Sequence, residues 1–452
     1  ITIETKQDIT INIDDEVTIT GVAKFLDVTG TGKVTINGTK DGAAQKIKMT
    51  TNFGEVGGDT GIVYLDAAGA DVTCNGGDYY SVETGNVGST YSVFCVKDGS
   101  LKLNKVIAEA GESTGVVDCG VYTTSSLATV EIHGGSFKAS GFNSRVIHCG
   151  NKGTMTINNA TLEMHNGGSY VLAANGSSAE LKIYSSTVIG ENETSCVTVQ
   201  HRGSFWAENC EFTSVGNQNY NGGLLYMLSG EATIKDSSYV AKQSGVNGIR
   251  TSYMLYGLNG PHKLTVENTE IKGCENALSF GYDPDGSDIK LKNVTFEDNE
   301  TDIYLENDEN TPANAPQVKL DKGTQNLKLA SKNDGWLIGY KKDADGEYRY
   351  LTKREGDNYF GLNTINATAT TGEGDNAATL ESYAQLTEGT PVKLTADIPG
   401  GKPCTGWKVE KIAAEGVTEV HDAGVIKYDP ENPETATLTM PHYDIFVTAE
   451  YE

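Results

Sequence analysis

A short pattern of apolar residues returns along the first three quarters of the chain. Each copy has two apolar side chains separated by one residue, then a third apolar or aromatic side chain five places later. Clear copies begin at Val130, Met155, Leu181, Phe205, Ala232, Leu264 and Ile289, and weaker ones at Val34, Val72 and Leu101. The clear copies begin 25, 26, 24, 27, 32 and 25 residues apart. A period of this length predicts a solenoid in which each copy forms one coil.

Each coil carries three apolar stretches. In the coil that begins at Met155, residues 155–157, 161–164 and 170–174 are apolar or alternate, and Asn- and Gly-rich turns separate them. Three short strands per coil predict a three-faced parallel β-helix, right-handed because parallel crossovers strongly prefer that hand. Inward residues of successive coils should then stack into apolar ladders. The expected fold class is therefore all-β.

The pattern changes twice towards the C-terminus. The repeat thins after Leu305, so we expect the β-helix to span residues 1–334. Residues 335–361 contain two apolar stretches around Asp345-Gly346, which predicts a hairpin that caps or links the solenoid, because an open solenoid end needs a cover. Residues 362–452 are predicted to form a small all-β module.

Charge limits the partners of this chain. The formal net charge is −26 and the pI is near 4.6, which oppose binding to nucleic acid or to an anionic membrane. No apolar run approaches the roughly 18 residues that a membrane-spanning helix needs. We therefore expect no nucleic acid partner and no membrane insertion within this chain.

The eight cysteines form no C-x-x-C pair, so a metal knuckle or a thioredoxin-type motif has no support. Cys95, Cys149 and Cys196 lie in apolar runs, where a small thiol can stack between coils. We expect free, buried thiols.

Polar side chains recur at comparable places in several coils. The candidates for one binding flank are Arg145, His148, Gln200, His201, Arg202 and Arg250. Tyr226 and Tyr256 could add ring faces on which sugars stack. Such a flank would suit sugar binding or a polysaccharide lyase. The alternative is that the histidines are ordinary residues near turns and the arginines pair with surface carboxylates.

A calcium site is a further candidate. Asp283, Asp285 and Asp288 lie in one Asp-Pro-Asp-Gly-Ser-Asp segment. The order departs from an EF-hand loop, because the glycine directly follows the second aspartate. A polar turn is the alternative, and we predict no other cofactor.

The C-terminal segment carries a recognisable series of motifs. These are Gly389-x-x-Val-x-Leu-Thr-Ala396, Gly406-Trp-x-Val409 and Thr439-Met-Pro-x-x-Asp-Ile-Phe-Val-Thr-Ala-x-Tyr451. The series resembles the divergent internalin-type B repeat of Gram-positive surface proteins. That resemblance implies a small β module that acts as a spacer to the cell wall, with Trp407 in its core.

The solenoid resembles pectate-lyase-like β-helices in architecture only. Proteins of that class often carry polysaccharide-degrading sites on an outer face. The N-x-D, D-D, G-H-G and R-x-K series of polygalacturonases is absent from this sequence. A lyase or a glycoside hydrolase therefore stays an alternative function.

These features favour a bacterial, non-catalytic adhesin that binds glycans or host proteins through a solenoid flank. The expected location is extracellular, on the cell surface or in the cell wall, with attachment through segments outside this chain. A purely structural stalk is a third possibility.

Overall fold

The computed structural model describes residues 1–4, 6–50, 61–81, 92–112, 114–120, 127–141, 143–192, 194–216, 222–243, 245–252, 261–280, 287–305, 318–321, 327–331, 336–343, 346–353, 356–372, 377–380, 384–397, 401–413, 416–419 and 424–451. The chain divides into two compact units. The first contains Ile1–Ser279, Pro284–Gly286 and Thr295–Glu300, and the second contains Phe280–Asp283, Ser287–Val294 and Thr301–Glu452.

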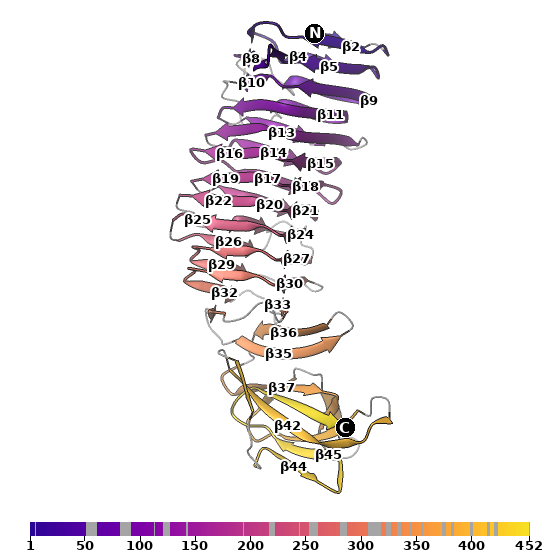
Figure 1. Cartoon of the computed structure of the whole chain (residues 1–452), viewed down its shortest axis with the longest axis vertical. Helices are drawn as coiled ribbons and strands as arrows, with labels where there is room; N and C mark the ends of the chain where they lie inside the picture. Colours follow the sequence, from indigo (N-terminus) through magenta and orange to yellow (C-terminus); the bar gives the residue numbers. More distant parts are fainter. Residues whose placement is uncertain are drawn as a thin grey trace. The chain divides into compact units, whose positions relative to one another are not determined.

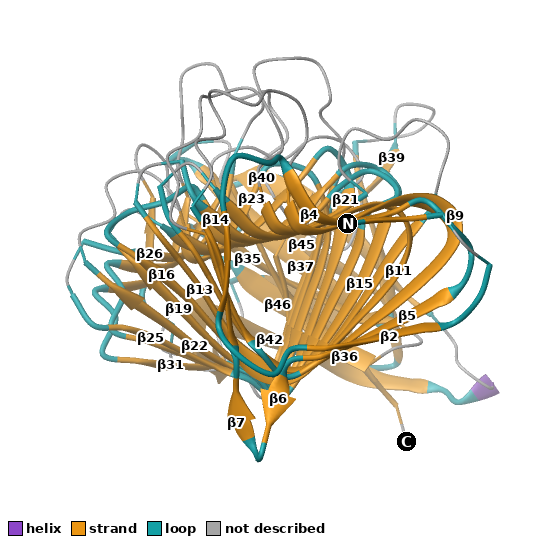
Figure 2. Ribbon diagram, turned by 90° about the horizontal axis from the view of Figure 1, so that it is seen from above, coloured by secondary structure: helices purple, strands orange, loops and turns teal. Residues whose placement is uncertain are grey.

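The first unit is a parallel β-solenoid with three strands in each coil, as the repeat predicted (Figure 1). Each strand pairs in parallel with the corresponding strand of the next coil, so the strands form three long sheets that surround the apolar interior (Figure 2). No α-helix occurs among the described residues, and none of them forms a helix that could cross a membrane.

The three sheets take the following strands, with long strands contributing to more than one sheet. The first sheet contains β1 (Thr2–Ile3), β4 (Lys24–Val28), the first parts of β9 (Gly61–Asn75) and β11 (Ser92–Ala110), β12 (Gly115–Cys119), β14 (Arg145–Cys149), β17 (Tyr170–Asn175), β20 (Ser195–Gln200), β23 (Gly222–Met227), β26 (Asn247–Thr251) and β29 (Asn276–Phe280). The second sheet contains β2 (Ile9–Asn12), β5 (Lys33–Asn37), further parts of β9 and β11, the first part of β13 (Ala128–Ser140), β15 (Gly153–Asn158), β18 (Glu180–Tyr184), β21 (Gly203–Glu208), β24 (Gly230–Lys235) and β27 (His262–Glu267). The third sheet contains β3 (Val17–Ile19), β8 (Lys46–Met49), β10 (Asp78–Ser81), the last parts of β11 and β13, β16 (Thr161–His165), β19 (Thr187–Glu191), β22 (Glu211–Val215), β25 (Ser238–Ala241), β28 (Glu270–Lys272) and β31 (Thr295–Glu297). A small hairpin, β6 (Thr39–Lys40) and β7 (Ala43–Ala44), projects from an early coil.

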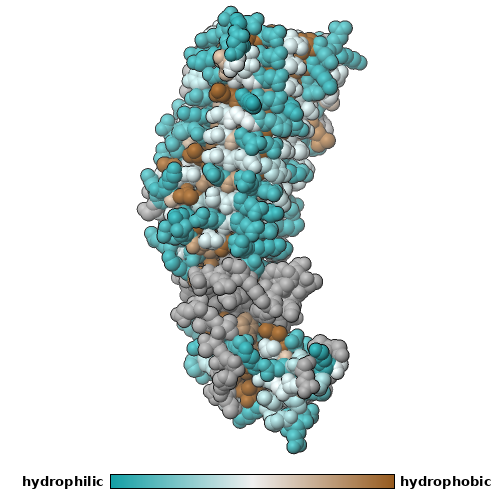
Figure 3. Space-filling view, in the orientation of Figure 1, coloured by the Kyte–Doolittle hydropathy of each residue, from teal (hydrophilic) through white to brown (hydrophobic). Residues whose placement is uncertain are grey.

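The predicted apolar ladders are present in the interior. The ladder of the second sheet runs through register partners that are all at most 2% exposed: Val130, Met155, Leu181, Phe205, Ala232 and Leu264. Full burial of a large apolar side chain stabilises a fold by roughly 1.5–3 kcal/mol, so stacked ladders of this kind hold the coils together. The face seen in Figure 3 is mostly hydrophilic along these coils, in keeping with the acidic composition.

The cysteines are free and buried, which confirms the prediction from the apolar runs. Cys119 and Cys149 are register partners on neighbouring coils. Burial raises the pKa of Cys74 and of Cys196 to about 12, so these two thiols stay protonated and unreactive at neutral pH.

The second unit contains further parallel pairs and a hairpin. β30 (Asp288–Lys292) pairs in parallel with β33 (Val318–Leu320), and β32 (Thr301–Leu305) pairs with β34 (Leu329–Ser331). β35 (Trp336–Asp343) and β36 (Gly346–Lys353) pair antiparallel, and β36 also pairs antiparallel with β33. The predicted boundaries at 334/335 and 361/362 stay predictions.

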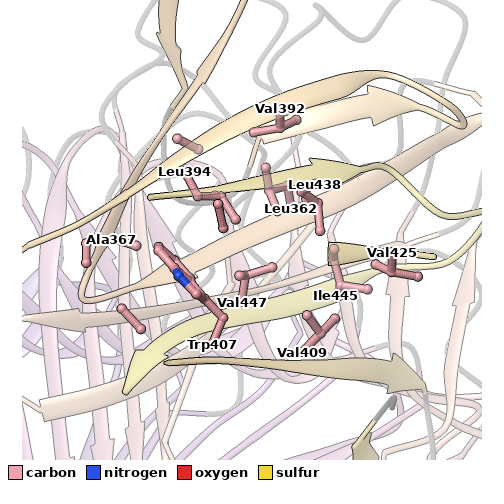
Figure 4. Packing of buried hydrophobic residues seen from close by; sticks show 14 of the residues in the cluster. Leu362, Ala367, Val392, Leu394, Trp407, Val409, Val425, Leu438, Ile445 and Val447 are labelled. Carbon is pink, nitrogen blue, oxygen red and sulfur yellow. The ribbon is translucent and has the colours of Figure 1, made fainter. Parts of the chain in front are cut away.

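The C-terminal residues form two five-stranded sheets. One has the order β40 (Ala384–Thr387), β37 (Tyr359–Ile365), β46 (Ile445–Tyr451), β42 (Cys404–Ala413), β43 (Gly416–Glu419), and the other β39 (Ala378–Leu380), β38 (Ala367–Thr371), β41 (Pro391–Ala396), β45 (Asn432–Thr439), β44 (Ile426–Asp429). Their apolar residues share one core (Figure 4). Trp407 is 7% exposed there, and its Nε1 donates to the Pro433 carbonyl at 2.7 Å, so it is a core residue as predicted.

Candidate functional site

The outer face of the first sheet carries polar side chains on strands that are otherwise fully buried. In β14, Val146, Ile147 and Cys149 have no exposed surface, whereas Arg145 and His148 are partly exposed. The burial pattern therefore places these two predicted site residues on the outer side of the sheet. They lie in one coil and contact the same carboxylate.

That carboxylate is Asp118 of β12, which is 1% exposed. Arg145 donates to it from Nε at 2.9 Å and from Nη2 at 2.5 Å, and the Ser92 hydroxyl donates to it as well. Burial alone would raise the pKa of Asp118, but the Arg145 guanidinium, His148 and Ser92 more than offset this, so the pKa lies below its usual value. Gly115 leaves room for the pair, because a Cβ there would lie 3.0 Å from the Arg145 Nε.

His148 lies beside the same carboxylate, with its Nδ1 3.7 Å from Asp118 Oδ1. Burial and the Arg145 guanidinium lower the pKa of His148 to about 4, against the opposing effect of Asp118. The imidazole is therefore neutral at pH 7, and its contact with Asp118 is not an ion pair there. Its ring packs edge-on against Tyr170 of the next coil, with the ring centroids 5.8 Å apart.

Asn175, at the end of β17, connects this buried group to a third coil. Its Nδ2 donates to His148 Nε2 at 3.3 Å, and its Oδ1 lies 2.5 Å from His201 Nδ1. Because an amide oxygen only accepts, His201 carries a proton on Nδ1. The contacts link successive coils in one series, which we call the polar row: Ser92, Asp118, Arg145, His148, Asn175 and His201. Hydrogen bonds make all of its links except the 3.7 Å contact between His148 and Asp118.

The polar row ends at a strained turn between β20 and β21. His201 and Arg202 have φ angles of 52° and 66°, so two consecutive residues with side chains adopt the left-handed conformation. This conformation costs a non-glycine residue roughly 1–2 kcal/mol. The Arg202 backbone N–H donates to Ser229 Oγ at 3.1 Å, which helps to hold the turn. Single left-handed residues, mostly Asn or Asp, also occur at other turns of this chain, so the distinctive feature here is a consecutive pair that contains an arginine.

A hollow of about 420 Å³ lies at this turn, and we call it the His201 pocket. Its walls come from the turns of three neighbouring coils: Asn151, Asn175, Gly176, Ser177, His201 and Arg202. Gly176 allows the neighbouring turns to approach each other closely, because its φ is 129° and a Cβ there would lie 2.6 Å from the Asn151 Cα. All the lining side chains are polar, so the pocket suits a hydroxyl-rich ligand.

Arg202 supplies the charge of the His201 pocket. Its side chain is exposed. Within the described part of the chain, no hydrogen bond or ion pair engages its guanidinium. A guanidinium with free donors is well shaped to bind a carboxylate with two hydrogen bonds.

The other predicted site residues lie at different distances from the strained turn. Gln200 is the register partner of Asn175, one residue before the strained turn. Tyr226 and Arg250 are register partners of each other on β23 and β26, further along the same sheet. Tyr256 lies outside the described residues.

The structure describes only one of the three residues of the predicted calcium site. Asp283 and Asp285 lie outside the described residues. Asp288 begins β30, and its Oδ2 lies 2.5 Å from Lys290 Nζ, so it already forms an ion pair. No group of metal-binding side chains occurs among the described residues. The calcium site stays a prediction.

The sequence analysis did not single out three members of the polar row: Ser92, Asp118 and Asn175. Asp118 lies in the run Val116-Val-Asp-Cys-Gly120, where a carboxylate among apolar residues is itself informative. Aligning that run with Val146-Ile-His-Cys-Gly150 places Asp118 next to His148, and the register confirms this. Asn175 had no such signal, because asparagine is common in the turns of this chain.

Comparison with known proteins gives one weak structural similarity and no family. No family model matches the chain, and no curated protein matches it. A weak structural similarity exists to the enzymatically active domain of tailspike protein 4 of bacteriophage CBA120, with a TM-score of 0.31 and 9% identity over 93% of this chain. The alignment covers 63% of that tailspike chain, so this chain spans less than two thirds of its length.

At this TM-score the similarity carries no argument about function. The internalin-type resemblance finds no support in these comparisons. The plain finding is a parallel β-solenoid followed by a small β-sheet region.

Proposed function

We propose that this protein binds an acidic polysaccharide on the outer face of its first sheet, with the His201 pocket holding one uronate ring. The observation that carries the proposal is the exposed Arg202 guanidinium at the edge of a polar hollow, on a turn that is held in a strained conformation.

Electrostatics explain why the ligand would bind here rather than elsewhere on the chain. A net charge of −26 disfavours the approach of an anionic polymer to most of the surface. The Arg202 guanidinium would offer a local cation, and Asn151 and Ser177 would offer donors and acceptors to sugar hydroxyls.

The polar row would keep the pocket in one shape. His201 is fixed by Asn175, and Asn175 by the buried His148 next to the Asp118–Arg145 pair. A binding site that is rigid before the ligand arrives loses less entropy on binding.

We further propose that the protein acts outside the cell as a non-catalytic adhesin at the cell surface. Polysaccharide ligands of this kind are encountered there, and the C-terminal β module would then serve as a spacer. A host surface protein is the competing ligand for the same flank.

Binding is tested by retention on immobilised polyuronate compared with a neutral polymer of the same size. We expect Arg202→Ala to weaken polyuronate binding by roughly tenfold, which corresponds to about 1.4 kcal/mol, the worth of a charge-assisted contact. Lys242→Ala is the matched control, because it removes one exposed cation after β25 of the third sheet. Equal losses in both variants would refute the pocket and leave a general charge effect.

A specific observation also favours catalysis as a second candidate. When it carries only the Nδ1 proton, His201 presents an unprotonated Nε2. That nitrogen could remove the proton beside a uronate carboxylate, while the electron pair forms a carbon–carbon double bond and the glycosidic oxygen leaves with a proton from water.

Cleavage of this type creates unsaturated sugar ends, which absorb ultraviolet light. Their appearance with the wild type, and their loss in His201→Gln, would support a lyase and contradict the non-catalytic adhesin. Binding without new ends would support the adhesin.

A further inference from the structure

The second sheet carries one large aromatic side chain where its neighbours are polar. Trp206 lies between Phe205 and Ala207, which are 2% and 0% exposed and face the interior. The alternation of the strand therefore directs Trp206 outwards, and its side chain is half-buried. Its register partners on the two adjacent coils are Lys182 and Thr233. The same position in further coils holds Glu131, Thr156 and Thr265, so an indole is an exception there.

The indole is held in place rather than loose on the surface. Its Nε1 lies 3.3 Å from Glu208 Oε2, two residues further along the same face of β21. Glu208 is in turn the register partner of Tyr184 on β18. Trp206 and Tyr184 are therefore diagonal neighbours on one outer face, at a Cα spacing of roughly 7–8 Å that aromatic side chains can bridge. Tyr184 is also half-buried.

We propose that Trp206 and Tyr184 form a platform that stacks the apolar face of a neutral pyranose ring. An aromatic face binds the C–H face of a sugar, while polar groups at the rim satisfy its hydroxyls. Glu208 can accept such hydrogen bonds, and the Lys182 ammonium can donate them. The Lys182 side chain is 45% exposed, so it can reach a ligand on this face.

This platform is separate from the His201 pocket. Arg202 and Trp206 are four residues apart along the chain, which corresponds to roughly 13 Å in an extended strand. The two sites also suit different ligands. The pocket has an exposed cation and polar walls, whereas the platform has aromatic ring faces with one acidic and one basic side chain, Glu208 and Lys182. The proposal therefore stands whether or not the pocket binds polyuronate.

Tryptophan fluorescence tests the platform directly. The probes are neutral hexasaccharides of β-1,4-linked glucose, mannose and galactose, titrated into the whole chain. We expect at least one to give a saturable change in emission. The buried Trp407, hydrogen-bonded to Pro433, should contribute a constant background.

Variants separate the platform from other sources of the signal. Both Trp206 variants lack the reporting indole, so calorimetric titration measures their affinity. Trp206→Ala should abolish binding, whereas Trp206→Phe and Tyr184→Ala should weaken it by roughly tenfold or less. Arg202→Ala should leave the titration unchanged. Trp206→Phe keeps an aromatic ring on the strand, so it remains informative if Trp206→Ala is poorly folded. The proposal is overturned if no neutral hexasaccharide gives a saturable change, or if calorimetry shows that binding survives in Trp206→Ala.

Discussion

The outer faces of the first and second sheets belong to the same coils, yet they differ in burial. All five residues of β12 are buried, including Asp118. In β18, buried residues alternate with partly or fully exposed ones: Glu180, Lys182 and Tyr184 all keep contact with water. A polar group that loses water needs a protein partner, whereas one that keeps water does not. The polar row therefore supplies protein partners to polar groups that are out of contact with water. The polar side chains of the second sheet keep their water and need no such partners.

Removing one partner from the polar row should give the largest loss of stability. Arg145→Ala leaves the Asp118 carboxylate buried without its main counter-charge, and we expect a loss of about 3–5 kcal/mol in the free energy of unfolding. Equilibrium denaturation measures this loss. Adding Asp118→Asn to the variant should restore part of it, because a neutral amide is cheaper to bury. No restoration would mean that Arg145 acts through packing alone.

The second prediction concerns pH. The pKa of His148 is about 4 in the folded chain and near 6.5 when unfolded, so below pH 6.5 the unfolded state binds more protons. Its contribution to stability is therefore complete above pH 6.5 and is lost as pH falls towards 4, by about 2 kcal/mol at pH 5. Burial likewise lowers the pKa of His262 to about 4.

Denaturation between pH 7.5 and 5 tests both histidines. His148→Gln and His262→Gln should each remove part of the pH dependence, and the double variant should remove both contributions. A wild-type slope in the double variant would contradict the burial of the two neutral imidazoles.

The third prediction separates stability from binding at the strained turn. Arg202→Gly should relieve the left-handed conformation and stabilise the fold by about 1 kcal/mol relative to Arg202→Ala. Both variants should lose polyuronate binding to the same extent. If the two variants unfold at the same denaturant concentration, the turn is not strained in solution.

The ladders were predictable from sequence, because apolar periodicity alone determines which residues face inwards. Met155, Leu181 and Phe205 occupy the positions that the repeat assigned to them. The Asp118–Arg145 pair was not predictable in the same way, because its partners are 27 residues apart and a polar contact has no periodic signature. The strained turn was also missed: a pair of left-handed residues usually reads Asn-Gly, and His201-Arg202 gives no such signal.

The smallest effect should come from an ion pair on the open second sheet. Lys263 Nζ lies 2.6 Å from Glu231 Oε1, about as close as Arg145 lies to Asp118, but the two side chains are 55% and 57% exposed. Water solvates both charges in either state, so Lys263→Ala should change the free energy of unfolding by less than about 0.5 kcal/mol. Equilibrium denaturation of Lys263→Ala and of Arg145→Ala under the same conditions measures the difference between the two losses. A loss above about 2 kcal/mol would show that proximity rather than burial sets the worth of these pairs, and would remove the distinction between the two outer faces.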